Sequence, residues 1–347
     1  MIVQLNKAKS KSGLGRYVDL VAQINYPGAK LYNLIYDKYT KMRDTFPAGT
    51  TINGVFPFVS SGWKFNSVFQ NLIYKLPDDA VYHYLMHTFK PFRRDKNDLV
   101  TIHDAYVLER ENKYRNSWEK ATAKNFEKYK EFDNVITDSQ TVSDQLRRFG
   151  FDNEITTIHI PADPIINFEL SKKLRDENIG KKEFAGKRLL ISVSGNGPNK
   201  NLPMMKAVID ALPDDCFLIR VGDSIGSQKE ITYSEIDYIR LLELYSVSDA
   251  LLFPSTNEGY GIPQVEAISM GIPVLAYDLP VSHELLGDSA LYATTKDQFV
   301  ENAIDMLENR EYYARKARER AGEFQFDKFS SRMSRIYQKI EKNKGLV

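Results

Sequence analysis

The chain has 347 residues, of which 42% are apolar, so it can bury two hydrophobic cores and we expect two domains. Its 47 Lys and Arg residues nearly balance 46 Asp and Glu residues. This balance excludes a general electrostatic attraction to nucleic acid, so we expect no nucleic-acid partner, and any attraction to an anionic membrane must be local.

The cysteine content and the termini bear on the compartment. A single cysteine, Cys216, excludes an internal disulfide and is typical of a reducing environment. The N-terminus reads MIVQLNKAKSKSG and lacks the apolar core of a signal peptide. No apolar run approaches the roughly 18 residues of a membrane-spanning helix. We therefore expect a cytoplasmic protein.

Short apolar runs recur along both halves of the chain and alternate with helix-like segments. In the first half they are residues 2–5, 29–35, 80–84, 99–102, 135–137 and 155–160, and in the second half 189–193, 216–221, 250–253 and 273–276. Runs that are apolar throughout indicate strands buried on both faces. The pattern predicts an α/β protein with a doubly wound parallel sheet in each half.

A change in composition separates the two halves. Pro161 and Pro164 precede the polar stretch 171–187, which indicates a hinge followed by a solvated connector, so the boundary is placed near Asp163. The tail, residues 326–342, has apolar residues at helical spacing.

The first glycine motif follows the first predicted strand and reads SGLGRYV over residues 12–18. Gly13 and Gly15 would let the backbone cradle a phosphate, and Arg16, with Lys9 and Lys11 nearby, would add positive charge. The alternative is an ordinary strand-to-helix turn inside a solvated basic loop.

Histidines stand at the ends of two other predicted strands. His103 and Asp104 follow the run 99–102, and His83 lies in the run 80–84. Either histidine could face a ligand, and the alternative is a structural residue with both ring nitrogens bonded. His83 and His87 make no metal pair, because no carboxylate or thiol cluster completes a site. The chain also lacks Asp-x-Asp, so we expect no bound metal.

Residues 138–150 and 194–202 follow two further strands. The first segment, DSQTVSDQLRRFG, reads as a helix capped by Ser139 or Thr141 and is interpreted as scaffold. The second, SGNGPNKNL, places Lys200 before a helix, where a lysine can neutralise a pyrophosphate as a point charge. A solvent-exposed lysine is the alternative.

The most informative segment is FPSTNEGYGIPQVEAISMGIP, residues 253–273. Gly259 and Gly261 allow close approach of the backbone to a ligand, and the helix that starts near Pro263 offers free N–H groups to an anion. Glu258 and Glu266 would repel a phosphate, so they are better placed on hydroxyl groups of a ribose and a sugar. Alternatively, Glu258 is a solvated loop residue and Glu266 stabilises a first helical turn.

This segment resembles the donor-site motif of the glycosyl transferases group 1 family, retaining enzymes with the GT-B fold of two Rossmann-like domains and an interdomain cleft. The resemblance implies that Glu266 holds the nucleotide ribose, Glu258 contacts the donor sugar, and the backbone from Gly259 through Tyr260 and Gly261 to Ile262 meets sugar and phosphate. It also implies that Lys200 stabilises the leaving diphosphate. Gly195 lies in the same loop, and Asn199 stands where the family frequently has an arginine.

The resemblance also implies domains, substrates and a reaction. Residues 1–163, with a C-terminal helix over about 327–347, would form the acceptor-side domain, and residues 164–326 the donor domain. His103 would orient the donor hexose or the acceptor hydroxyl, with His83 and Asp104 on the acceptor side. A hexose of mannose or glucose type would pass from a GDP-, UDP- or ADP-sugar to a glycan or lipid-linked acceptor, without a metal or other cofactor. A nucleotide-sugar epimerase and a non-catalytic nucleotide-sugar-binding protein are the alternatives.

A segment of the first half has the pattern of a membrane-surface helix. Its apolar residues lie near helical spacing beside Lys64 and Lys75, and they are Trp63, Phe65, Phe69, Leu72, Ile73 and Leu76. It would place the protein at the inner face of the membrane, next to a lipid-linked acceptor. Ordinary packing of a helix against the first domain is the alternative.

Overall fold

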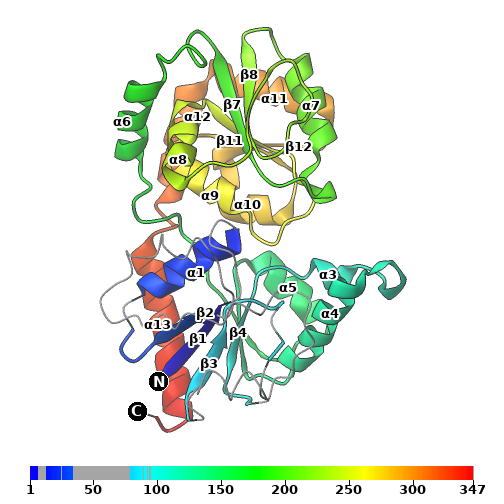
Figure 1. The fold of residues 1–347 in the computed structure, drawn as a ribbon, viewed down its shortest axis with the longest axis vertical. Helices are drawn as coiled ribbons and strands as arrows, with labels where there is room; N and C mark the ends of the chain where they lie inside the picture. The colour runs from blue at the N-terminus through cyan, green and yellow to red at the C-terminus, as the bar shows by residue number, and fades with distance from the viewer. Residues whose placement is uncertain are drawn as a thin grey trace. The chain divides into compact units, whose positions relative to one another are not determined.

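The computed structural model describes residues 1–6, 13–24, 26–33, 79–88, 90, 91, 93 and 95–346 (Figure 1). They form two compact units, Met1–Ile160 with Asp327–Val347, and Pro161–Phe326. Each unit contains one six-stranded sheet. The prediction of two doubly wound α/β domains is confirmed. The expected surface helix over residues 63–76, together with Lys9 and Lys11, lies outside the described residues.

The N-terminal sheet has the strand order β2-β1-β3-β4-β5-β6, and all its neighbouring strands are parallel. Its strands are β1 (Ile2–Asn6), β2 (Lys30–Asn33), β3 (Val81–Tyr84), β4 (Leu99–Ile102), β5 (Asn134–Thr137) and β6 (Glu154–Thr157). Its helices include α1 (Gly13–Gln23), α3 (Tyr106–Glu109), α4 (Ser117–Tyr129) and α5 (Gln140–Arg148). Every residue of β3, β4 and β5 is buried, which is what the continuous apolar runs predicted.

The C-terminal helix α13 (Phe326–Asn343) packs on the N-terminal sheet (Figure 1). The buried hydroxyl of Tyr337 lies 2.8 Å from Nδ1 of His83 on β3. Near the end of the helix, Glu341 accepts a hydrogen bond of 2.7 Å from the hydroxyl of Tyr26. The apolar spacing predicted for this tail corresponds to one buried face, made of Phe329, Met333, Tyr337 and Ile340.

The C-terminal sheet has the strand order β12-β11-β10-β7-β8-β9, again with parallel neighbours throughout. Its strands are β7 (Arg188–Val193), β8 (Cys216–Val221), β9 (Glu230–Tyr233), β10 (Ala250–Phe253), β11 (Val274–Tyr277) and β12 (Ala290–Ala293). From β7 the chain first adds β8 and β9 on one side and then crosses to add β10, β11 and β12 on the other. The strand order therefore reverses between β7 and β10.

Helices cover both faces of the C-terminal sheet. They are α6 (Phe168–Asn178), α7 (Leu202–Ala211), α8 (Tyr238–Val247), α9 (Ile262–Ser269), α10 (Pro280–Leu286), α11 (Lys296–Glu308) and α12 (Arg310–Ala321). One core joins α7 and α11 to the same face of the sheet, as Figure 1 shows, with Val208, Leu190, Leu252 and Phe299 among its buried residues. This packing holds the ends of β7 and β10 in place.

Three local expectations need correction. Gly13 and Gly15 lie in the first turn of α1 and not in a loop ahead of it. The stretch 171–187, expected to be a solvated connector, contains most of α6, whose Arg175 pairs with Asp249 at 2.8 Å. Helix α9 starts at Ile262, so Pro263 takes its second position. Polar composition hid α6, because only two of its residues are buried.

Candidate functional site

The carboxyl ends of β7 and β10 meet where the strand order of the C-terminal sheet reverses. In open α/β sheets this position leaves a crevice, since the connections leave the two strands in opposite directions. A short 3₁₀ helix, Pro198–Lys200, follows β7, and the loop with Glu258 follows β10. The two segments that the sequence singled out thus lie side by side.

Several contacts join these two loops. The backbone N–H of Thr256 donates to the carbonyl oxygen of Asn199 at 2.8 Å, and the side-chain amide of Asn199 donates to the carbonyl oxygen of Asn257 at 2.9 Å. Lys200 Nζ forms an ion pair with Glu258 Oε1. Both side chains of this pair are largely buried. The loops therefore form one unit that presents a cation and a carboxylate together.

Helix α9 begins directly beside this pair, and Gly261 makes that start possible. Gly261 has a φ of 96°, and a Cβ there would lie 2.4 Å from Nε2 of Gln264. No side chain caps α9. None caps α7 either, which begins directly after Asn201, a residue with a φ of 54°. Two helix N-termini with their partial positive charge therefore lie next to Lys200, and the arrangement suits an anion.

Glu266 lies in α9 and is only 1% exposed. The hydroxyl of Tyr245 on α8 donates to its Oε2 at 3.2 Å. Tyr260, in the loop before α9, is also buried, whereas Gly195 in the β7 loop is exposed. A buried carboxylate accepts hydrogen bonds only, so Glu266 is suited to hydroxyl donors and not to phosphate oxygens.

The residues predicted in the N-terminal domain are divided among several places. Gly13, Gly15 and Arg16 share the first turn of α1, so their backbone N–H groups belong to a helix N-terminus. Asp104 is half-buried after β4, and its carboxylate lies 3.8 Å from Nε2 of the buried His87.

His103 is buried at the end of β4, with both ring nitrogens bonded. Nδ1 lies 2.5 Å from Oδ2 of Asp138, and Nε2 donates to the carbonyl oxygen of Leu85 at 2.8 Å. Burial alone would lower the pKa of His103, but the charge and hydrogen bond of Asp138 and the carbonyl of Leu85 raise it above the ordinary value. The contacts with Asp138 and Leu85 therefore favour the protonated form of the His103 ring.

His83 is fully buried on β3, where Nδ1 faces Tyr337 and Nε2 lies 2.8 Å from Oγ1 of Thr101. Burial, followed by the charge of His103, lowers its pKa to about 3, so it is neutral. These contacts give His83 a structural role between β3, β4 and α13. Its predicted role on the acceptor side is not supported by any of them.

Sequence reasoning missed two residues. The sequence predicts only a scaffold helix over residues 138–150. Ser139 does cap α5, but Asp138 itself is bonded to His103. Arg220 was overlooked inside the apolar run 216–221, although it is fully buried and contacts the β7 loop. A carboxylate directly after a strand, and an arginine within one, were the available signals.

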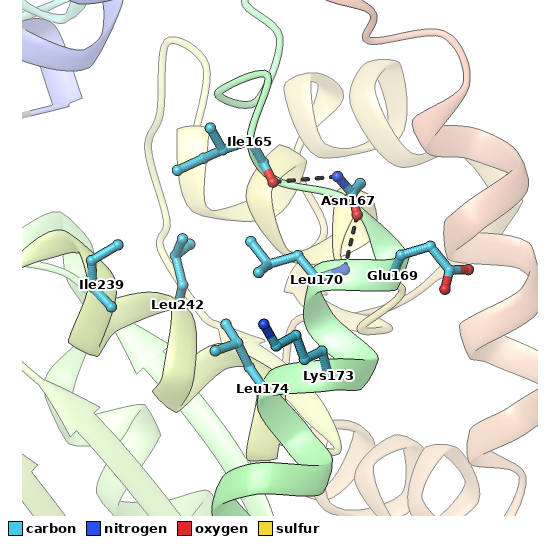
Figure 2. Close-up of a pocket in the computed structure, with 8 residues that line it drawn as sticks. All are labelled: Ile165, Asn167, Glu169, Leu170, Lys173, Leu174, Ile239 and Leu242. Atoms are coloured by element: carbon cyan, nitrogen blue, oxygen red, sulfur yellow. Dashed lines mark hydrogen bonds between the residues drawn. The ribbon is translucent and has the colours of Figure 1, made fainter. Parts of the chain in front are cut away.

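A groove of about 530 Å³ lies elsewhere in the second unit, between α6 and α8 (Figure 2). It is mostly apolar, and its lining residues are Ile165, Asn167, Glu169, Leu170, Lys173, Leu174, Ile239 and Leu242. None of the residues predicted for the donor site lines it. It therefore contributes nothing to the arrangement at β7 and β10.

Within the described part of the chain, no group of three or more His, Cys, Asp or Glu side chains could hold a metal ion. The helices that the structure describes include none that is long and apolar enough to cross a membrane.

A model of the family described as Glycosyl transferases group 1 matches residues 175–324, which is nearly all of the second unit. The second unit belongs to the glycosyl transferases group 1 family. The matched residues include Lys200, Glu258 and Glu266, and therefore both of the paired loops that follow β7 and β10.

A named relative agrees with this assignment. The O-antigen chain mannosyltransferase RfbU of Salmonella typhimurium (strain LT2) is 28% identical over 179 residues, which are 47% of this chain and 47% of that protein. The chain thus spans about half the length of this relative.

Two solved structures have the same fold as this chain. WaaG, a glycosyltransferase involved in lipopolysaccharide biosynthesis, has a TM-score of 0.75 at 16% identity, covering 97% of this chain and 99% of that chain. Anabaena Alr3699/HepE, solved in complex with UDP and glucose, has a TM-score of 0.74 at 15% identity. The match covers 100% of this chain and 99% of that chain. The fold is GT-B, as predicted.

Proposed function

We propose that this protein is a retaining glycosyltransferase that moves a hexose from a nucleoside-diphosphate sugar to a hydroxyl group of a glycan or lipid-linked acceptor. The observation that carries the proposal is the Lys200–Glu258 pair, held at the reversal point of the C-terminal sheet next to the uncapped start of α9. A cation and a helix N-terminus suit a diphosphate, and carboxylates suit sugar hydroxyls.

In the proposed reaction the bond between the anomeric carbon and the diphosphate oxygen breaks, and negative charge develops on the leaving diphosphate. Lys200 and the first N–H groups of α9 would stabilise this charge. Glu258 would accept from hydroxyls of the donor sugar, and Glu266, with Tyr245 behind it, from the ribose. The acceptor oxygen would bond to the anomeric carbon on the face from which the diphosphate leaves, and the leaving oxygen would take the acceptor proton. This route requires no protein base and leads to retention.

The donor hexose is proposed to be of the mannose or glucose type. RfbU is named as a mannosyltransferase, and Alr3699/HepE was solved with UDP and glucose. These names support two candidate donors, GDP-mannose and UDP-glucose. We also propose that no metal takes part, because Lys200 and the helix N-termini supply positive charge at the diphosphate position.

The test begins with thermal unfolding of the purified protein in EDTA, titrated with GDP-, UDP- and ADP-sugars. A selective ligand stabilises the folded state and raises Tm. The donor identified in this way is then incubated with glycan and lipid-linked acceptors, and release of the nucleoside diphosphate is measured. Release that depends on an acceptor supports the transferase. Conversion of the sugar without acceptor would favour an epimerase, and binding without turnover a non-catalytic binding protein. No rise in Tm with any sugar nucleotide would contradict the proposal.

A further inference from the structure

Arg220, on β8, is fully buried at the carboxyl end of the C-terminal sheet, opposite Ser192 on β7. Each of its five N–H groups points to a backbone carbonyl oxygen. Nε donates to Asp223 at 3.1 Å, Nη1 to Ser192 at 3.4 Å and Val221 at 2.9 Å, and Nη2 to Ser194 at 2.8 Å and Gly195 at 3.2 Å. Arg220 therefore holds the start of the loop that leads to Lys200.

The positive charge of Arg220 has no carboxylate in contact. Across the described residues Arg220 forms no ion pair, and the nearby carboxylates have other partners: Asp223 accepts from Asn196 at 2.7 Å and Glu230 from the backbone N–H of Gly226 at 3.1 Å. Carbonyl dipoles satisfy its hydrogen bonds but carry no net charge. Asp223 and Glu230 act on the guanidinium electrostatically, but from beyond ion-pair distance. A buried charge normally has a counter-ion in contact, so a guanidinium without one beside an anion-binding arrangement calls for a functional explanation.

Gly222 makes this packing possible. Its φ is +138°, and a Cβ there would lie 2.3 Å from the carbonyl oxygen of Ser194 and 2.7 Å from Nη2 of Arg220. A side chain at residue 222 would have to displace either the β7 loop or the guanidinium. The conformation of this turn and the position of Arg220 therefore depend on each other.

We infer that Arg220 is the positioning residue of the diphosphate subsite. Its planar fork fixes the β7 loop that carries Lys200, and its buried positive charge draws the diphosphate to that loop. Since all five N–H groups are already bonded, Arg220 acts through the loop and through its electric field, without a direct hydrogen bond to phosphate. It also supplies a second cation in a chain whose residue 199 is Asn. This inference rests on the proposed function.

The test compares a nucleoside diphosphate with the corresponding monophosphate by isothermal titration calorimetry. The nucleotide pair is the one among UDP/UMP, GDP/GMP and ADP/AMP that binds the wild-type protein most tightly. The variants are Arg220→Gln, Arg220→Lys and Gly222→Ala. The control is Arg188→Gln, which removes one positive charge at the amino end of β7, where Arg188 pairs with Asp215 at 2.7 Å.

For Arg220→Gln we expect the preference for the diphosphate over the monophosphate to fall about tenfold. Arg220→Lys should recover part of it, because lysine keeps the charge but cannot span five carbonyls. Gly222→Ala should weaken diphosphate binding more than monophosphate binding, and Arg188→Gln should change neither. An unchanged preference in Arg220→Gln would overturn the inference. Equal losses for both nucleotides also leave the preference unchanged, so they would overturn the inference in the same way and give Arg220 a purely structural role.

Two further outcomes are also decisive. If Arg220→Gln does not fold, Arg220→Lys and Gly222→Ala take its place, and equal losses for the two nucleotides in both variants would overturn the inference. If the wild-type protein binds none of the diphosphates, the proposed function is wrong and the inference falls with it. Binding by the wild type with an unchanged preference in the variants leaves the proposed function standing and removes only the role of Arg220.

Discussion

Lys200 and Glu258 are 58 positions apart in the sequence and form an ion pair across the reversal point of the C-terminal sheet. Each side chain holds the other in place, so the two groups are positioned together at the site. A diphosphate would compete with Glu258 for the ammonium group, which would release the carboxylate for the sugar hydroxyls. Preorganisation of this kind reduces the loss of side-chain entropy on binding.

The first prediction concerns Lys200. Lys200→Ala should lower kcat roughly 100-fold and weaken donor binding by less, because one preorganised cation acts most strongly on the charge that develops in the transition state. Steady-state turnover and equilibrium donor affinity are measured separately. Lys206→Ala is the control, since Lys206 pairs with Asp210 on the surface of α7. An unaltered turnover in Lys200→Ala would remove its role at the leaving group.

The second prediction concerns Glu266. Glu266→Gln should weaken nucleotide binding by roughly 10- to 100-fold, because hydrogen bonds from the ribose to a charged acceptor contribute about 1.5–3 kcal/mol. Calorimetry with the preferred nucleoside diphosphate measures the change. Tyr245→Phe removes the hydroxyl that donates to Glu266 and should have a much smaller effect. Unchanged affinity in Glu266→Gln would contradict the ribose assignment.

The third prediction concerns Gly261. Gly261→Ala should destabilise the fold by about 1–2 kcal/mol through strain at positive φ, and it should also abolish nucleotide binding because the new Cβ would displace Gln264 at the start of α9. Gly226→Ala is a matched control, with a φ of +72° and nothing within 4 Å of the added Cβ. Urea unfolding and nucleotide titration are carried out on both. Retained binding in Gly261→Ala would contradict the role of this turn.

The fourth prediction concerns pH and the pair of His103 and Asp138. The folded-state pKa of His103 is raised, so the stability that the pair contributes is fully present below the unfolded pKa of about 6.5 and is lost as pH rises through the folded value. The free energy of unfolding in urea is measured for the wild type and for Asp138→Asn at a series of pH values on both sides of about 6.5. The difference between the two proteins at each pH is the contribution of the pair. That difference should shrink towards high pH. A difference that is constant with pH would mean that His103 does not titrate in this way.

His83 provides the opposite case in the same experiments. Its folded-state pKa is lowered to about 3, so between that pH and the unfolded value the unfolded chain binds the additional proton. Stability from this residue is present above about pH 6.5 and decreases by up to about 1.4 kcal/mol per pH unit on acidification. His83→Gln should reduce this acid sensitivity. If the variant and the wild type show the same slope of unfolding free energy against pH, the buried neutral state assigned to His83 is wrong.

The sequence alone was sufficient for the fold class and for most strands of both sheets. Strands buried on both faces are apolar along most of their length. Such a strand can be recognised from its own residues, whichever elements pack against it. The segment around Glu258, Gly261 and Glu266 could likewise be read locally, because its turn and the helix that follows are encoded within a few neighbouring residues. By contrast, the weakly buried α6 left no such run and was missed.

Only the tertiary structure decided which side chains act together. Asp138 is bonded to His103, which lies 35 positions away in the sequence. Arg220 donates hydrogen bonds to a loop that begins 26 positions before it. Such pairs depend on strand order and register, which bring the carboxyl ends of different strands to one edge of a sheet. Hydrophobic periodicity describes one helix or strand at a time and contains no information about which strand will lie next to it, so these partners could not be read from the sequence.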